Sequence, residues 1–210
     1  MQTRSAQLTA FLNTMHSAIV ERTSTQSDAY RATTRIMQAL KEEREAATPE
    51  PVWLAPCEHL DNAMENVAIQ ASLETEGQPA RASASLVEHT RALLDIAPTL
   101  AWWHRTADVK LGSPFANGHA NATLIGQGGL EERDDVWVGI SLMAPNIEYP
   151  EHHHAPEEVY LVMSPGHWRQ DRGEWFEPGI GGLVCNTPNI LHAMRSGSAP
   201  LLATWCLCKN

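Results

Sequence analysis

Apolar residues recur three and four positions apart near the start of the chain, at Leu8, Phe11, Leu12, Met15 and Ile19. This spacing places them on one face of an α-helix and predicts an amphipathic helix. Similar patterns predict three further helices, over residues 27–47, 61–71 and 83–96. Residues 48–51 contain two prolines and should end the second of these, because proline cannot continue a helix interior. The polar stretch 74–79 should connect the last two.

After residue 98 the pattern changes to short β-branched and aromatic runs separated by Gly, Pro, Asn and Asp, which is typical of antiparallel strands and tight turns. The predicted strands cover residues 122–126, 136–143, 157–163, 182–186 and 201–208. We therefore predict an α+β protein. Its helical N-terminal region, residues 1–98, is expected to precede a C-terminal antiparallel β-barrel, residues 99–210.

The charge balance limits the classes of partner that the protein is expected to bind. Fifteen basic residues against twenty-five acidic residues give a net charge of −10, the wrong sign for a nucleic-acid partner. No apolar run reaches the ~18–20 residues that span a bilayer, and the N-terminus has no secretory signal pattern. We therefore expect a cytoplasmic protein without a membrane partner. The four cysteines show no CxxC spacing and are expected to be reduced structural thiols.

Residues 149–160 carry three consecutive histidines and end in Glu-Glu-Val-Tyr. Successive side chains of an extended strand point to opposite faces, so every second residue shares a face. The residues expected on one face are His152, His154, Glu158 and Tyr160. Their neighbours His153 and Glu157 are expected to point away.

A later histidine, His192, is expected to join this face, because it follows a turn at Pro188 and begins a strand. Imidazoles and a carboxylate together form a ligand set that suits a divalent metal. Zinc is our first choice, with iron, manganese, cobalt or nickel as alternatives. The other histidines stand singly and are expected to be solvated or hydrogen-bonded; they are His16, His59, His89, His104, His119 and His167.

Two groups of residues resemble the two motifs of the cupin superfamily. The first is His152-x-His154-x3-Glu158 with Pro165-Gly166, and the second is Gly182-x5-Pro188 with His192. The chain departs from the usual pattern at Ile190, where a glycine is expected. The resemblance implies that the predicted barrel is a cupin barrel with a metal site.

A narrower resemblance covers nearly the whole chain. The string Tyr-x-x-His-x-His-x3-Glu-x-Tyr, formed by Tyr149, His152, His154, Glu158 and Tyr160, resembles the cupin-type dimethylsulfoniopropionate (DMSP) lyases of marine bacteria, the DddQ group in particular. Few other cupins place a tyrosine two residues after the glutamate. The resemblance implies that His154, Glu158 and His192 bind the metal, and that Tyr160 is the base and a further oxygen ligand.

The implied reaction is β-elimination of the small-molecule substrate DMSP to dimethyl sulfide and acrylate. It needs removal of an α-proton and no external nucleophile. A free tyrosine, with a pKa of ~10, is too weakly ionised to act as a base at neutral pH, but an adjacent cation favours its phenolate. We therefore expect Tyr160 to be the general base. Tyr149 and His152 are candidates to orient or gate the substrate, and a purely structural role is the alternative for each.

Two other functions use the same residues. An Fe(II)-dependent cupin dioxygenase would need open metal positions for O2 and substrate, and Tyr160 would compete for them. A non-catalytic cupin would bind a small ligand and release no product. Six of the seven tryptophans lie after residue 98, and such aromatic faces attract a sulfonium cation by ~0.5–2 kcal/mol.

Overall fold

The structure is a computed structural model that describes residues 3–72, 84–105 and 113–209. Its helices are α1 (Ala6–Val20), α2 (Asp28–Ala39), α3 (Leu60–Ser72), α4 (Ala84–Ile96) and α5 (Pro114–Gly118), with short 3-10 turns at Ala55–His59 and Ala97–Thr99. Its strands are β1 (Trp102–Trp103), β2 (His119–Ile125), β3 (Val136–Met143), β4 (Glu148–His152), β5 (Glu157–Val162), β6 (His167–Gln170), β7 (Leu183–Asn186), β8 (His192–Arg195) and β9 (Leu201–Cys208). The predicted mixture of helices and antiparallel strands is confirmed.

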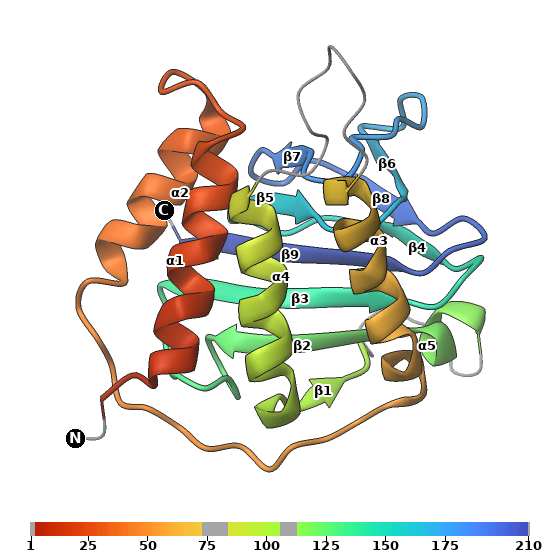
Figure 1. Cartoon of the computed structure of the whole chain (residues 1–210). Coiled ribbons are helices and arrows are strands. Elements are labelled where there is room, and N and C mark those ends of the chain that lie inside the picture. The colour runs from red at the N-terminus through yellow and green to blue at the C-terminus, as the bar shows by residue number, and fades with distance from the viewer. Residues whose placement is uncertain (1–2, 73–83, 106–112, 210) are drawn as a thin grey trace.

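The strands form two antiparallel sheets. The larger has the order β1-β2-β3-β9-β5-β7, and the smaller has the order β4-β8-β6. Within the described residues neither sheet closes on itself, so the predicted barrel takes the form of two separate sheets. Helices α1 to α4 lie across one face of the larger sheet, and the smaller sheet lies on its other side (Figure 1).

Two buried clusters follow from this layering. Helix residues such as Phe11 and Leu93 share the first cluster with Val159 and Leu161 of β5. Tyr160 of the same strand belongs to the second cluster, which includes side chains of both sheets. Complete burial of a large apolar side chain contributes about 1.5–3 kcal/mol. The alternation along β5 therefore divides its side chains between the helix layer and the space between the sheets.

The first predicted helix is confirmed: Ser5 caps it by accepting a hydrogen bond from the Leu8 amide. The predicted helix over residues 27–47 is wrong at its end, because α2 stops at Ala39. Arg133 donates to the carbonyls of Ala39 and Glu42, and the following chain bridges to Glu131. The charged run after residue 40 offers no apolar face, so these contacts with the sheet determine its path.

Strands β3 and β9 have the predicted bounds, and β2, β5 and β7 lie within a few residues of theirs. Strands β1, β4 and β6 and helix α5 were not predicted as separate elements; each is at most five residues long, too short to show a period. The predicted connection 74–79 lies outside the described residues. All four cysteines are free, as predicted. No helix in the described ranges has the length and apolarity needed to cross a membrane.

Candidate metal centre

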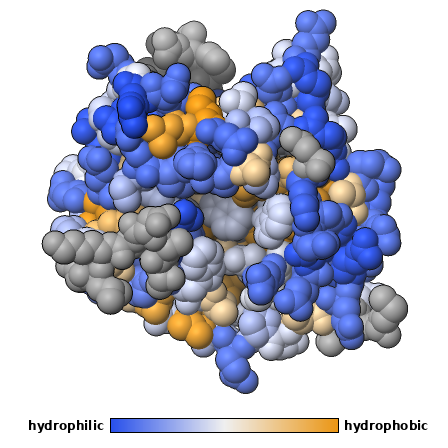
Figure 2. Space-filling model, turned by 180° about the vertical axis from the view of Figure 1, so that it is seen from behind, coloured by the Kyte–Doolittle hydropathy of each residue, from blue (hydrophilic) through white to orange (hydrophobic). Residues whose placement is uncertain are grey.

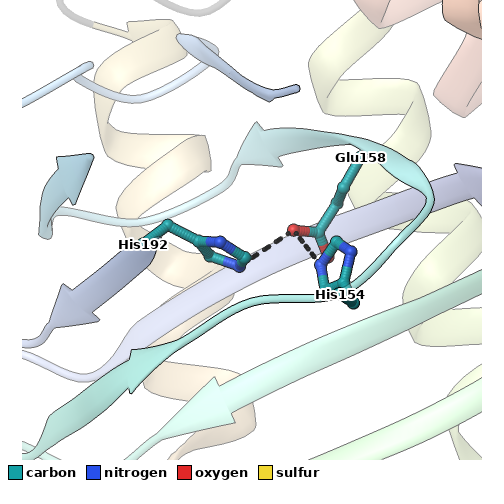
Figure 3. A group of neighbouring side chains, drawn as sticks. All are labelled: His154, Glu158 and His192. Carbon is teal, nitrogen blue, oxygen red and sulfur yellow. Dashed lines mark hydrogen bonds and ion pairs between the residues drawn. The ribbon is translucent and has the colours of Figure 1, made fainter. Parts of the chain in front are cut away.

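Three side chains from separate places in the sequence converge at one end of the space between the sheets. His154 lies in the turn before β5, Glu158 lies on β5, and His192 begins β8 (Figure 3). The Oε2 atom of Glu158 lies 3.2 Å from Nε2 of His154 and 3.4 Å from Nε2 of His192. One ligand atom from each residue lies within 4.8 Å of the others. We call this group the His-Glu-His triad.

Backbone carbonyls orient both imidazoles of the triad. Nδ1 of His154 lies 2.9 Å from the Pro156 carbonyl oxygen, and Nδ1 of His192 lies 2.9 Å from that of Ile190. When Nδ1–H donates to these carbonyls, each Nε2 directs a lone pair toward Glu158. A lone pair and a carboxylate attract each other only with a cation between them, either a proton or a metal ion. Nε2 of His192 is also buried without a hydrogen-bond partner.

Glu158 is held in place from its other side. Asn186 of β7 donates to Glu158 Oε2 over 2.9 Å, and Gln170 of β6 donates to the Asn186 side-chain oxygen over 2.6 Å. Burial alone would raise the pKa of Glu158, but the neighbouring imidazoles of His154 and His192 hold that pKa well below its usual range. The carboxylate is therefore ionised at neutral pH. An ionised carboxylate with two oriented imidazoles suits a divalent metal ion.

The other residues predicted for this face lie next to the triad. The His152 ring packs 4.1 Å from the His192 ring and 4.2 Å from the Tyr149 ring, measured between centroids. The pKa of the His152 imidazole is lowered to about 3; burial is the largest cause and the nearby His192 is the second. Tyr160 is buried, and its burial and the Glu158 charge raise the pKa of its phenol well above the usual value. A nearby cation is therefore needed to ionise Tyr160.

The residues predicted to point away do so. Glu157 forms an ion pair with Arg35 of α2, on the helix side of the sheet, and His153 is exposed. The structure thus brings His152, His154, Glu158, Tyr160, Tyr149 and His192 together. Strand alternation accounts for the common side of Glu158 and Tyr160, which lie two residues apart on β5. His152 ends β4 in the other sheet and His154 lies in the turn between the two strands, so the path of the chain brings these two to the same space.

All of these residues except His192 line a cavity of about 280 Å³ between the sheets. Three indole side chains line it, which we call the indole wall: Trp103, Trp137 and Trp205. Trp102 and Trp168 are instead fully buried. The face of the molecule opposite the helices has a hollow near its centre, bordered by side chains of intermediate hydropathy (Figure 2). The cavity is large enough for a small organic acid and has both polar and aromatic walls.

Sequence reasoning missed several residues near the cavity. Arg105 and Asn121 line it. His119, expected to be solvated or hydrogen-bonded, is 1% exposed, and both its ring nitrogens lack hydrogen-bond partners. Its ring packs against Phe115 and, 4.8 Å away, against Tyr149. His119 and Asn121 lie two residues apart on β2, so alternation along a strand that begins at residue 119 would have placed both on one face.

Comparison with known protein families identifies the family to which this chain belongs. The model of the dimethylsulfoniopropionate lyase family matches residues 25–203. The chain belongs to the dimethylsulfoniopropionate lyase family. The resemblance seen in the Tyr-x-x-His-x-His-x3-Glu-x-Tyr string is therefore confirmed, and a small-molecule lyase is the activity class of the family.

One curated relative of this DMSP lyase family member is a Cereibacter sphaeroides protein assigned as the DMSP lyase DddL. It is 27% identical over 108 residues, which are 51% of this chain and 45% of the relative. The alignment thus spans about half the length of each protein.

Two solved structures share the fold of this DMSP lyase family member over almost the whole chain. A chain from the crystal structures of the DMSP lyases RdDddP and RnDddQII matches with a TM-score of 0.68 and 22% identity, covering 97% of this chain and 93% of its own. The DMSP lyase DddQ from Ruegeria pomeroyi DSS-3 matches with a TM-score of 0.66 and 20% identity, covering 96% and 92%. At these identities the likeness establishes the fold.

Proposed function

We propose that this protein is a metal-dependent carbon–sulfur lyase that cleaves DMSP to dimethyl sulfide and acrylate. The observation that carries the proposal is the position of Tyr160, two residues along β5 from Glu158, on the same cavity as His154 and Glu158 of the His-Glu-His triad. The triad would hold a divalent metal, with zinc as our first choice, and Tyr160 would be a further oxygen ligand. The family match supports the reaction class.

The metal would act as a Lewis acid on the substrate carboxylate, which acidifies the α-carbon, and as the cation that favours ionised Tyr160. Tyr160 then takes the α-proton at its phenolic oxygen. The electron pair of the C–H bond forms the double bond of acrylate, and the bond from the β-carbon to sulfur breaks. The sulfur keeps that electron pair and leaves as neutral dimethyl sulfide.

The remaining residues of the constellation would prepare this step. Tyr149 and His152 stack beside His192, and the low pKa of His152, caused first by burial, keeps its ring neutral. A neutral imidazole adds no charge that would repel the sulfonium. We propose that both residues orient the substrate while Tyr160 performs the proton transfer.

We also propose that the two sheets act together as a cupin barrel over residues 99–210, with residues 1–98 as a helical region packed on one sheet. The helix-side cluster, which includes Val159 and Leu161, supports this division because it joins the helices to β5. A cytoplasmic location remains a prediction from the sequence.

The experiment that tests the function is detection of dimethyl sulfide in the gas phase above purified full-length protein given DMSP, with and without a chelator. We expect dimethyl sulfide and acrylate in equal amounts, and their loss on chelation. Oxygen consumption without dimethyl sulfide would instead indicate a dioxygenase. Binding of DMSP without either product would indicate a non-catalytic cupin.

A further inference from the structure

Among its described lining residues the cavity has one permanently cationic side chain, that of Arg105. Its guanidinium carbon lies 5.9 Å from the centroid of the Tyr149 ring. That ring stacks on His152, which packs against His192 of the triad. Arg105 therefore faces the same space as the triad, from the opposite side of an aromatic stack.

Several contacts fix the segment that carries Arg105. Trp103 of β1 pairs with Asn121 of β2, and its indole donates to the Thr123 hydroxyl over 3.1 Å. The His104 ring donates from Nδ1 to the His119 carbonyl oxygen over 2.8 Å. The residues just before Arg105 are thus fastened to the larger sheet, and the guanidinium is held beside the cavity.

No protein anion in the cavity neutralises this guanidinium. The one carboxylate among the described lining residues is that of Glu158, and it already faces two histidines and Asn186. No ion pair joins Arg105 to a carboxylate within the described residues. A guanidinium at a cavity that has Tyr149 beside it but no carboxylate partner among the described residues is suited to an anionic ligand, because a charge-assisted hydrogen bond is stronger than a neutral one.

The indole wall supplies the complementary surface. Trp137 and Trp205 come from β3 and β9, between the β1 edge that leads to Arg105 and the β5 strand that carries Glu158. Indole faces attract soft cations, whereas Arg105 repels them. A molecule with a carboxylate at one end and a sulfonium at the other therefore has one favoured orientation in this cavity.

We propose that Arg105 is a substrate-orienting residue that binds the carboxylate of the substrate and of acrylate, so that the sulfonium faces the indole wall. The carboxylate would lie between Arg105 and the triad. This assignment takes its substrate from the proposed lyase function. Its anion site can nevertheless be tested by binding alone.

The test is calorimetric titration of the metal-loaded full-length protein with acrylate and with acrylamide, its neutral isostere. We expect Arg105→Gln to weaken acrylate binding roughly ten- to hundred-fold and to change acrylamide binding less than about twofold. Arg105→Lys should recover part of the acrylate affinity, because it keeps the charge but not the planar fork. Arg91→Gln is the matched control, because Arg91 is exposed on α4 and lines a different groove.

Turnover provides a second readout. In Arg105→Gln the KM for DMSP should rise more than kcat falls, because binding is what the residue supplies. Equal weakening of acrylate and acrylamide, or no weakening of either, would overturn the assignment. If the parent protein binds acrylate through Arg105 but releases no dimethyl sulfide, the lyase function is refuted and the anion site is retained. If the parent protein releases dimethyl sulfide and Arg105→Gln binds acrylate and turns over DMSP as the parent does, the role of Arg105 is refuted and the lyase function is supported.

Discussion

Asn186 donates a hydrogen bond over 2.9 Å to Oε2 of Glu158, the same oxygen that faces both histidines of the triad. The two residues pair across β5 and β7, so the contact is built into the register of the sheet. Gln170 in turn fixes the orientation of the Asn186 amide. A carboxylate oxygen held in this way is already directed toward the proposed metal position.

We predict that Asn186→Leu weakens metal binding about ten- to hundred-fold, the usual cost of losing such a supporting hydrogen bond. The protein should still fold, because leucine has a similar volume. Metal affinity can be measured by competition with a chromophoric chelator. Asn13→Leu, at an exposed position on α1, is the control. Equal affinity in both variants would show that Glu158 needs no support from Asn186.

The His-Glu-His triad makes a direct prediction about metal content. Each of His154→Ala, Glu158→Ala and His192→Ala removes one of the three donors of the triad, so the purified variants should contain little metal and release no dimethyl sulfide. Elemental analysis measures the content. His153→Ala should keep the metal, because His153 is the exposed neighbour of these residues. Full metal content in all three triad variants would refute the site.

Tyr160→Phe removes one oxygen and keeps the ring, so packing and the His-Glu-His triad should survive. We predict that kcat falls by ~10²–10⁴-fold, the usual effect of a missing general base, in a folded variant that still holds metal. Tyr30→Phe, on α2, controls for loss of a hydroxyl. A rate within a few-fold of the parent would exclude Tyr160 as the base and make His152 the next candidate.

The free energy of unfolding should fall in acid because of His89, a residue of α4 whose side chain is completely buried against the larger sheet. Its Nε2 lies 2.9 Å from the Thr204 hydroxyl, and burial lowers its pKa from 6.5 to about 3. Between these values the unfolded chain binds the proton and the folded chain does not. The contribution of His89 is thus present above pH 6.5 and is lost as the pH falls toward 3, by about 2 kcal/mol between pH 6.5 and 5.

Urea unfolding at pH 7.5, 6 and 5 measures this dependence. A His89→Gln variant can still hydrogen-bond Thr204 but does not titrate, so its unfolding free energy should change less over the same range. Parallel pH dependence in parent and variant would mean that other groups, such as the buried His119, cause the loss.

The sequence predicted those parts of the molecule that depend on the spacing of apolar and polar residues within one helix or one strand. Leu8 and Ile19 are buried on α1 as the helical spacing requires, and Glu158 and Tyr160 share a side as strand alternation requires. The end of α2 was not predictable from local pattern, because the Arg133 hydrogen bonds come from almost a hundred residues away.

The candidate site shows the same division. The residues within one short motif could be recognised, since they lie within twelve consecutive positions, 149–160, and combine imidazole, carboxylate and phenol groups. Asn186 and Arg105 could not, because their roles depend on strand pairing that brings distant segments together. Neither belongs to a cluster of chemically similar residues in the sequence.

Strand β5 divides alternate side chains between two layers, and this limits how the gene can change. Loss or gain of one codon within β5 would exchange the two sets, bringing Val159 to the cavity and carrying Glu158 toward the helices. A change of one or two codons in the turn between β6 and β7 carries no such penalty. Descendants that keep this chemistry are therefore expected to vary in length at their turns while the spacing from residue 157 to residue 162 stays fixed.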